Sequence, residues 1–341
     1  MKIKLLDWIV SPCCAAPLRF SSLDQMPGGA ADIETGALAC STCGHKYPIV
    51  RGVPRLLPPG QGDAKVASTA ASFSYEWSRY PGTPEEDERI FLEESQLKPE
   101  DLKGKLILDA GCGMGRYSMA CLARGAEVVA MDLSMSLERL VEAARREPNL
   151  HVVQGDLHKP PLRKGIFDLV YSHGVLHHTS DTRKAFMAVS DLVKPEGLLS
   201  VWLYGMAGKY EEFATNPLRT DRAWVGEHRR LAWMVVGLRH FISDSIRLFT
   251  TRLPLAVAYA VCYPLTVLGA IPGLKYLTFS VHPKFKVRLI ENFDWLSPHF
   301  QFHHTKEELA SWYEEAGFDV LSYLPHGLVP KPGILGRRRR G

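Results

Sequence analysis

A glycine-rich turn in the middle of the chain is its sharpest chemical signal. The run DAGCGMGR at 109–116 comes directly after the apolar residues Leu106, Ile107 and Leu108. Glycines there let the backbone approach a ligand closely and turn sharply into a helix. The third glycine is Gly115, whereas the dinucleotide spacing GxGxxG requires position 116. The spacing therefore disfavours a nicotinamide dehydrogenase, and Asp109 is placed to meet an amino group.

Acidic side chains end the next two apolar runs. Asp132 closes the run at 127–131, and Asp156 lies in QGDL, directly after the run at 151–153. An acid about twenty residues beyond the glycines can accept hydrogen bonds from ribose hydroxyls, and a carboxylate one strand later can hold an adenine amino group. A single acid is also an ordinary turn residue. Three at successive strand ends, together with the glycines, indicate one nucleoside site.

Short apolar runs alternate with helical patterns between residues 105 and 204, which is typical of βαβ units and a parallel sheet. Ligands of such sheets bind at the carboxyl ends of the strands, where these acids stand. Ser134 is the expected N-cap of a helix, and Thr305 with Glu308 forms a capping box for a helix that Gly317 ends. We expect strands at 106–108, 127–131, 151–153, 167–171, 198–203 and 318–324.

The run from Leu106 to Leu203 resembles the class I S-adenosylmethionine-dependent methyltransferases, particularly the ubiquinone-biosynthesis-type subgroup. The matching segments are LDAGCGMGR, VVAMDLS, QGDLHKPP, FDLVYSHGVLHHTSDTRKAF and LVKPEGLLSVWLY, and the resemblance resumes at HHTKEELASWYEEAGFDV. It implies an α/β fold, a Rossmann-like sheet with helices on both faces, and S-adenosylmethionine as the cofactor. Its motifs carry no information on the acceptor or on oligomeric state.

The resemblance also implies roles for single residues. Asp109, Gly111 and Gly113 would hold the methionine part of the cofactor. Asp132 would hold the ribose, and Asp156 with Leu157 the adenine. The full set of cofactor contacts that we predict is Asp109, Gly111, Gly113, Gly115, Asp132, Leu133, Asp156, Leu157 and Ser172.

Histidines after the fourth expected strand are the candidate catalytic residues. Methyl transfer depends mainly on aligning the nucleophile, the methyl group and the sulfur in a dry site, and a base is needed where the acceptor is a hydroxyl or an acidic carbon. His177 and His178 are our candidates, because histidine titrates near neutral pH. The alternative is that one of them caps a helix or packs under the cofactor. His173 is a further candidate beside them, Tyr204 is a weaker one, and we interpret His299, His303 and His304 as lid or core residues.

Four cysteines near the N-terminus have the pattern of two zinc knuckles. Cys13 and Cys14 follow Pro12, and Cys40 and Cys43 form a CxxC. With YPIVRGVPRLL at 47–57, they resemble the short zinc-ribbon family that activates transfer-RNA and protein methyltransferases, here fused in cis. That family usually has CPxC in the first knuckle, whereas the first position here is Ser11. All four cysteines are predicted metal ligands, with His45 as a substitute; the alternative is a ribbon that has lost its metal.

An apolar and basic stretch interrupts the α/β alternation. Residues 253–274 carry no charge and are long enough to span a bilayer. A single crossing would put the later strand and helix on the wrong side of the membrane, and Pro254, Pro264 and Pro272 interrupt a continuous helix. Nine basic residues and one acid, Asp244, lie between His228 and Ile290. We predict a mostly helical cap near the cofactor, which either covers the substrate pocket as a lid or contacts anionic lipid.

Composition adds few constraints. The chain has 341 residues, 46% of them hydrophobic, and a formal net charge of +4. Seven cysteines, an odd number, favour a reducing compartment over a disulfide framework. The N-terminus develops no long apolar run, so we expect no signal peptide and a cytoplasmic protein. The alternative is a protein peripheral at the inner face of the membrane.

These patterns divide the chain into five parts. We expect a zinc-ribbon-like domain at 1–60, a helical linker at 61–104, a methyltransferase domain at 105–204 and 296–330, a helical insertion at 205–295 and a solvated basic tail at 331–341. The function that we expect is methyl transfer to a small-molecule or lipid-like acceptor. Two alternatives remain: a tRNA or protein methyltransferase, although the basic residues interleave with an apolar run and so disfavour nucleic acid, and an inactive cofactor-binding adaptor.

Overall fold

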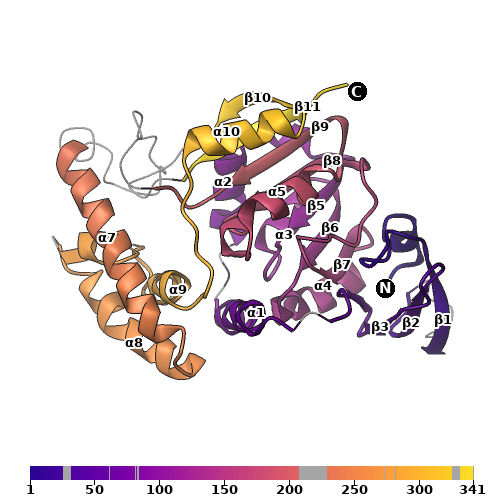
Figure 1. Cartoon of the computed structure of the whole chain (residues 1–341), viewed down its shortest axis with the longest axis horizontal. Coiled ribbons are helices and arrows are strands. Elements are labelled where there is room, and N and C mark those ends of the chain that lie inside the picture. Colours follow the sequence, from indigo (N-terminus) through magenta and orange to yellow (C-terminus); the bar gives the residue numbers. More distant parts are fainter. Residues whose placement is uncertain are drawn as a thin grey trace.

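The computed structural model describes residues 1–25, 32–60, 62–80, 82, 84–206, 229–272, 274–280, 282–324 and 331–340. Its described strands form one sheet in the order β1-β2-β3-β4-β7-β6-β5-β8-β9-β11-β10 (Figure 1). The strands are β1 (Leu18–Gln25), β2 (Thr35–Cys40), β3 (Lys46–Val50), β4 (Val53–Leu56), β5 (Leu106–Ala110), β6 (Glu127–Asp132), β7 (Leu150–Gly155), β8 (Phe167–His173), β9 (Val193–Trp202), β10 (Phe318–Tyr323) and β11 (Gly333–Arg338).

The middle of the sheet is parallel. β5 pairs with β6 on one side and β8 on the other, β6 pairs with β7, and β8 pairs with β9. The chain order therefore reverses direction at β5, and a crevice at such a switch point is where open α/β sheets bind ligands. The α/β fold and all five strands expected between residues 105 and 204 are confirmed.

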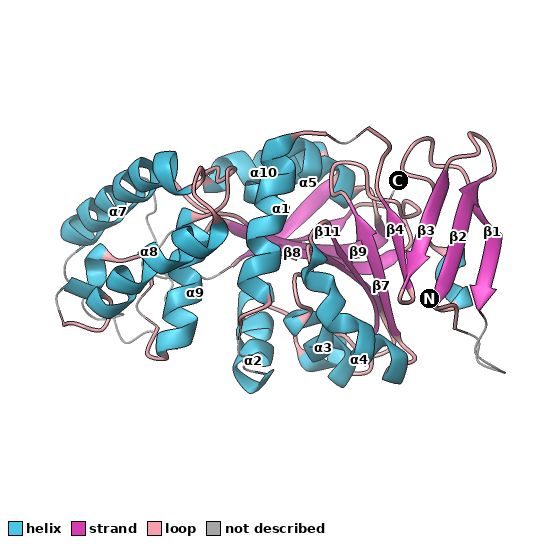
Figure 2. Cartoon of the chain, turned by 90° about the horizontal axis from the view of Figure 1, so that it is seen from below, coloured by secondary structure: helices cyan, strands magenta, loops and turns pink. Residues whose placement is uncertain are grey.

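Helices cover both faces of the sheet (Figure 2). Because successive side chains of a strand point to opposite faces, Ile107 joins the core cluster that includes Phe91 and Tyr117, while Leu108 joins the cluster that includes Phe186. The helices are α1 (Ala64–Trp77), α2 (Pro84–Ser95), α3 (Arg116–Ala123), α4 (Val141–Arg146), α5 (Thr182–Ser190), α7 (Arg229–Thr250), α8 (Leu255–Leu268), α9 (Phe285–Leu296) and α10 (Lys306–Glu315).

Local signals set several helix ends as expected. The Ser134 hydroxyl accepts a hydrogen bond from the Ser136 N–H at the start of a 3-10 helix that leads into α4. Thr305 and Glu308 form a reciprocal capping box at the start of α10. Gly317 follows α10 with a φ of 80°, in the left-handed region. These caps are confirmed.

The N-terminal strands are continuous with the main sheet. β1, β2, β3 and β4 form an antiparallel series, and β4 then pairs in parallel with β7 through Arg55 and Gln154. Leu38 and Tyr47 belong to the same buried cluster as Val129. The two parts of the chain therefore share one core.

The C-terminal segment is strand β11, and the prediction of a solvated basic tail at 331–341 is wrong. β11 lies between β9 and β10 and is antiparallel to both. Ile334 is fully buried, and the Arg338 guanidinium donates to the carbonyl oxygens of Ser190, Asp191 and Val193. The run of arginines indicated an exposed tail. The strand forms because it pairs with β9 and β10, which the local sequence does not show. Residues 325–330 and 341 lie outside the described part.

The predicted insertion contains α7, α8 and α9, which stand at the opposite end of the molecule from β1 in Figure 1. α8 and α7 both pack against α9. Pro264 lies inside α8, which spans only Leu255–Leu268 of the uncharged run. Within the described ranges, no helix combines the length and apolarity that a membrane crossing needs. Residues 207–228 of the predicted insertion lie outside the described part.

Candidate functional site

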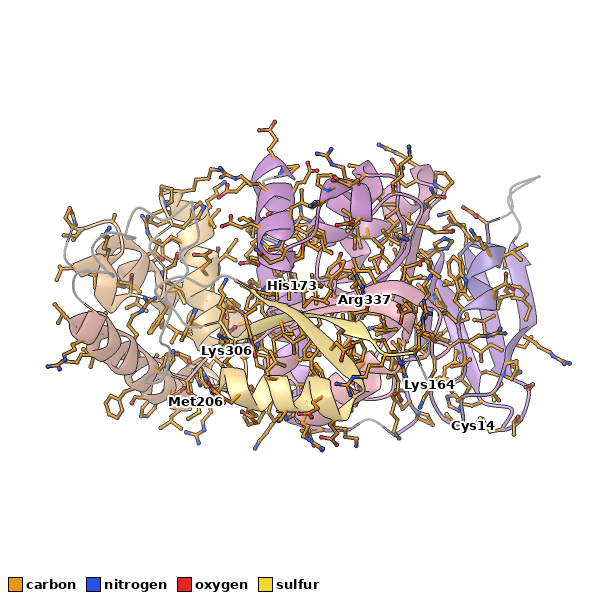
Figure 3. The ribbon with its side chains drawn as sticks, turned by 90° about the horizontal axis from the view of Figure 1, so that it is seen from above. Cys14, Lys164, His173, Met206, Lys306 and Arg337 are labelled. Carbon is orange, nitrogen blue, oxygen red and sulfur yellow. The ribbon has the colours of Figure 1, made fainter. Side chains whose placement is uncertain are left out.

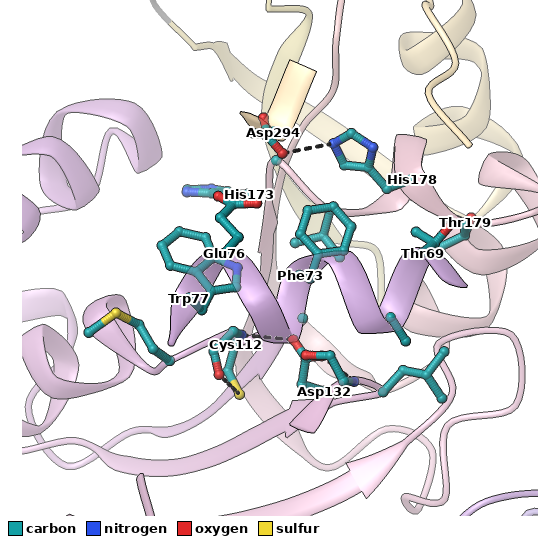
Figure 4. Close-up of a pocket in the computed structure, with 18 of the residues that line it drawn as sticks. Thr69, Phe73, Glu76, Trp77, Cys112, Asp132, His173, His178, Thr179 and Asp294 are labelled. Carbon is teal, nitrogen blue, oxygen red and sulfur yellow. Dashed lines mark hydrogen bonds and ion pairs between the residues drawn. The ribbon is translucent and has the colours of Figure 1, made fainter. Parts of the chain in front are cut away.

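A cavity of about 290 Å³ lies at the carboxyl ends of β5, β6, β7 and β8. Helices α1 and α9 close it on the other side (Figure 4). The predicted site residues in its lining are Asp109, Gly111, Gly113, Asp132, Leu133, Asp156, Leu157 and His178. Three further predicted residues are not among the lining residues: Gly115, Ser172 and His177.

The glycine turn is shaped by close approaches. A Cβ at Gly115, where φ is 84°, would lie 2.2 Å from a methyl group of Leu140, so this glycine permits α3 to start against the 3-10 helix. A Cβ at Gly113 would lie 3.1 Å from the Trp77 indole nitrogen, inside the cavity. Gly113 therefore keeps the backbone open to a ligand, whereas Gly115 serves packing.

Asp132 holds the turn in place. One of its carboxylate oxygens accepts from the Gly113 N–H at 2.7 Å, and the other accepts from the Ser134 N–H at 2.7 Å. Burial raises the pKa of this carboxyl group above its usual value. Each oxygen of a carboxylate has two acceptor positions, so both keep capacity for ligand hydroxyl groups.

Asp109 and Asp156 lie in the same lining. Asp109 is 4% exposed and accepts from the Ser118 hydroxyl at 2.6 Å, and burial raises its pKa to about 6. Asp156 accepts from the His158 N–H at 2.9 Å. With Asp132, these carboxylates come from or directly follow three parallel strands and face one cavity.

Ser172 has a different role from the predicted cofactor contact. Its side chain is fully buried, and its hydroxyl donates to the Ala110 carbonyl oxygen at 2.8 Å. It therefore ties the end of β8 to the end of β5, beside the glycine turn.

The two candidate histidines are separated by the structure. His178 lines the cavity, and its Nδ1 lies 2.9 Å from the Phe300 carbonyl oxygen. Because a carbonyl oxygen only accepts, Nδ1 carries the hydrogen and Nε2 carries the lone pair. Nε2 makes no hydrogen bond among the described residues and lies 3.8 Å from an Asp294 carboxylate oxygen (Figure 4). Burial lowers the pKa of His178 to about 3, so the ring is neutral.

His177 packs outside the cavity lining. Its ring is fully buried and stacks on Tyr204 with the ring centres 4.0 Å apart. Its Nδ1 accepts from the Tyr204 N–H at 3.3 Å. This placement matches the packing alternative for one of the two histidines, and it leaves His178 as the one placed to meet an acceptor.

Helix α1 is a part of the site that sequence reasoning missed. The range 61–104 was interpreted as a linker, but α1 lines the cavity with Val66, Thr69, Ala70, Phe73, Glu76 and Trp77. Helix α9 lines it with Val287, Ile290, Glu291, Asp294 and Trp295. In both segments these residues recur three or four positions apart, the spacing of one helix face. That spacing does not show which edge of the sheet the helix covers.

Three cysteine thiols converge at the other end of the molecule. The Sγ atoms of Cys14, Cys40 and Cys43 lie within 4.8 Å of one another. The N–H groups of Cys43 and Thr42 lie 3.5 Å from the Cys40 Sγ, and these bonds lower the pKa of Cys40 to about 6. They favour the thiolate, which is the form that binds zinc. The residues fit a metal ion.

Cys13 is not in this cluster, so the prediction of four assembled cysteine ligands is wrong for the geometry seen. Its Sγ lies 2.9 Å from the Tyr47 hydroxyl. Cys13 and Cys14 are adjacent, and the turn that carries them directs the two thiols to different partners. Figure 3 places Cys14 near the edge of the molecule and His173, a cavity residue, near its centre. The cluster is therefore separate from the cavity.

Two family models match the chain. Residues 108–201 match a methyltransferase domain, and residues 2–52 match a model described as Trm112p-like protein. The chain therefore carries a class I methyltransferase domain and an N-terminal Trm112p-like segment, which confirms both resemblances.

Relatives match only part of the chain. Malonyl-(acyl-carrier protein) O-methyltransferase of Enterobacter lignolyticus is 36% identical over 94 residues, which cover 28% of this chain and 37% of that protein. A tRNA U34 carboxymethyltransferase of a Geobacter species is 28% identical over 124 residues, covering 35% of this chain and 38% of that protein. An S-adenosylmethionine-dependent methyltransferase of Mesorhizobium loti has a TM-score of 0.41 at 17% identity, covering 75% of this chain and 99% of that chain.

Proposed function

We propose that the protein is an S-adenosylmethionine-dependent methyltransferase that acts on a small or lipid-like acceptor. The observation that supports this most strongly is the convergence of Asp109, Asp132 and Asp156 on one cavity at the ends of three parallel strands. The matched methyltransferase domain spans all three. When bound, S-adenosylmethionine supplies an activated methyl group from its sulfonium.

The residues present fit this cofactor. Gly113 lines the cavity without a side chain, and a Cβ there would press on the Trp77 indole at 3.1 Å. Asp132 would accept hydrogen bonds from the ribose hydroxyls, and Asp156 with Leu157 would hold the adenine. Asp109 would attract the amino group of the methionine part. Phe73 and Trp77 of α1 exclude water from the same space.

The choice of acceptor rests on the cavity itself. The E. lignolyticus relative is named for a malonyl-(acyl-carrier protein) acceptor and the Geobacter relative for a tRNA. We favour a small or lipid-like acceptor because aromatic and aliphatic side chains from α1 and α9 cover the cavity. The adaptor alternative is disfavoured, since the three cofactor-facing acids are intact and the cavity is open beside them.

Replacing Asp132 by alanine should weaken binding of S-adenosylhomocysteine by about 1–3 kcal/mol, because buried ribose hydroxyls lose a charged partner. Calorimetry with the purified protein measures this loss. Glu85→Ala on the exposed start of α2 is the control and should bind as the wild type does. Absence of binding to the wild type, or tighter binding of NAD than of S-adenosylhomocysteine, would overturn the proposed function.

The insertion supports a second element of the proposal, contact with an anionic lipid surface. Large apolar side chains of α7 and α8 are exposed, and Phe241 is 70% exposed. We define this apolar face as Leu231, Met234, Leu238, Phe241, Leu248, Val257, Val261 and Val267. Exposed basic residues flank it in sequence: Arg230, Arg252, Lys284 and Lys286. An apolar face with basic flanks suits an anionic membrane interface.

Three of the basic residues counted from the sequence are unavailable to lipid. Arg239 and Arg288 are buried, and the Arg288 guanidinium donates to the Thr266 carbonyl oxygen. Arg247 is mostly buried and forms an ion pair with Asp244 at 3.2 Å. They support the insertion from inside, so we expect the electrostatic contribution to lipid binding from the four exposed residues, of which Lys284 also lies 3.0 Å from a Glu86 carboxylate oxygen.

Vesicle flotation should show binding to vesicles of anionic phosphatidylserine and phosphatidylcholine but not to phosphatidylcholine alone. Flotation should be abolished when Arg230, Arg252, Lys284 and Lys286 are changed to glutamate. Each lost positive charge should weaken binding to the anionic surface by about 1 kcal/mol, and its reversal by more. The control is Arg19→Glu with Lys46→Glu, two exposed basic residues at the other end of the sheet. Failure of the wild type to float on anionic vesicles would leave the insertion as a lid alone.

A further inference from the structure

Three carboxyl groups gather on the side of the cavity away from the glycine turn. Glu76 comes from α1, and Glu291 and Asp294 come from α9 (Figure 4). Within the described ranges, none of the three forms an ion pair with lysine or arginine. Asp294 accepts from the Tyr204 hydroxyl and Glu291 from the Ser280 hydroxyl, while one Glu76 oxygen, Oε2, is buried without a hydrogen-bond partner.

The positive side chains in the same lining already have partners. The Arg116 guanidinium lies 3.3 Å from an Asp87 oxygen, and the Lys331 ammonium lies 3.1 Å from a Glu94 oxygen. A buried carboxylate without a partner is costly, and the cost disappears when a cation binds beside it. Glu76 is only 3% exposed. The cavity therefore has the charge pattern of a site for a positively charged ligand group.

Aromatic side chains line the cavity beside these carboxyl groups. Phe73 and Trp77 of α1 belong to this lining, as do Tyr204 and Trp295, whose rings stack on each other with their centres 4.9 Å apart. A cation over an aromatic face is attracted by its quadrupole, and such cages recognise ammonium groups. The Nε2 lone pair of His178, also in this lining, lies 3.8 Å from the Asp294 carboxylate. A hydrogen-bond acceptor thus stands beside the place where an ammonium group would bind.

We infer that the methyl acceptor is an amine, bound as its ammonium between Glu76, Glu291, Asp294 and the surrounding aromatic rings. This inference rests on the proposed function. The ammonium loses one proton to the Asp294 carboxylate, which frees the nitrogen lone pair. That lone pair forms the new bond to the methyl carbon, while the electrons of the broken carbon–sulfur bond stay on sulfur. A carboxylate acceptor would meet three carboxyl groups of its own charge.

Titration supports the same assignment. Burial raises the pKa of Asp294 to about 6 and that of Glu76 well above its usual value, and the Asp294 carboxylate further raises the pKa of Glu76. Glu291 also raises the pKa of both carboxyl groups. Arg116 lowers the pKa of both, and Lys331 lowers that of Asp294. Tyr204 donates to Asp294, and His178 beside it is neutral. A bound ammonium lowers carboxyl pKa values, so amine binding should release protons and weaken as the pH falls through about 6.

The test is calorimetry with octylamine, octanol and octanoate, each titrated into protein saturated with S-adenosylhomocysteine. Octylamine should bind at least about tenfold more tightly than the other two, a difference of about 1.4 kcal/mol. Its heat should depend on the buffer's ionisation enthalpy, because protons are released. Octyltrimethylammonium should also bind. It carries the positive charge but has no N–H proton, so its binding shows that the charge itself is recognised.

Glu76→Gln and Asp294→Asn should each weaken octylamine binding by roughly tenfold and leave octanol binding unchanged, and Asp294→Asn should remove the inflection near pH 6. Glu85→Gln, which makes the same change on an exposed residue of α2, is the control. Unchanged S-adenosylhomocysteine binding shows that each variant is folded. Equal affinity for the three probes, or tighter octanoate binding, overturns the amine assignment while the cofactor binds. Loss of S-adenosylhomocysteine binding by the wild type overturns the proposed function itself.

Discussion

Replacing His178 by alanine is expected to lower the rate of methyl transfer by about 10²-fold, because the acceptor loses the hydrogen-bond acceptor that positions it. The reason lies in how the ring is held. The Phe300 carbonyl oxygen fixes the hydrogen on Nδ1, so Nε2 presents its lone pair to the cavity. Rate measurements at saturating S-adenosylmethionine, with octylamine as acceptor, give the loss directly.

The pH profile distinguishes a base from a positioning residue. Burial lowers the pKa of His178 to about 3, so Nε2 stays unprotonated from weakly acidic to alkaline pH. A group with a lowered pKa becomes charged only as the pH falls through that value, and the wild-type rate should therefore show no histidine inflection between about pH 6 and 8. A residual rate in His178→Ala that rises with added imidazole would show instead that the ring acts as the base.

His177→Phe is the matched comparison. The phenyl ring can keep the stacking on Tyr204, while the acceptor for the Tyr204 N–H is lost. We expect a lower melting temperature but a rate per folded molecule within about threefold of the wild type, because His177 does not line the cavity. Equal rate losses in the two variants would contradict the separate roles of the two histidines, and an unchanged rate in His178→Ala would show that Nε2 does not position the acceptor.

The cofactor half of the site was predictable because its signals are local. Asp132 and Asp156 mark the ends of apolar runs, and parallel strands bring such ends to one edge whatever the rest of the chain does. Ser172 does not line the cavity, because its hydroxyl turns to the Ala110 carbonyl oxygen, and the sequence shows only that it ends β8. The position of a residue was predictable, but the direction of its side chain was not.

The acceptor half depends on long-range packing. Glu76 and Asp294 are separated by more than two hundred positions in sequence and meet only because α1 and α9 pack together over the strand ends. Each segment alone is an ordinary amphipathic helix, so neither pattern identified a cavity wall. The prediction of a basic tail where β11 lies was wrong for a related reason. The place of β11 between β9 and β10 is decided by strands that are distant in sequence.

The cysteine cluster leads to the second large effect, that of the metal. Elemental analysis of the purified protein should find about one zinc ion per chain, held by Cys14, Cys40 and Cys43. The N–H groups that lie against the Cys40 Sγ prepare that thiolate. Cys40→Ser should abolish zinc binding, whereas Cys13→Ser should retain it, because Cys13 contacts the Tyr47 hydroxyl and stays out of the cluster.

Loss of zinc should also destabilise the fold, because the strands that carry the cluster share a core with the main sheet. At free zinc about a thousandfold above the dissociation constant, removal should lower the free energy of unfolding by about 4 kcal/mol. Thermal unfolding with and without a chelator measures this for the wild type and for Cys13→Ser. A metal-free wild type that melts at the same temperature in chelator would show that the ribbon has lost its metal. Loss of zinc in Cys13→Ser would instead mean that metal binding turns Cys13 away from Tyr47 to complete four thiolates.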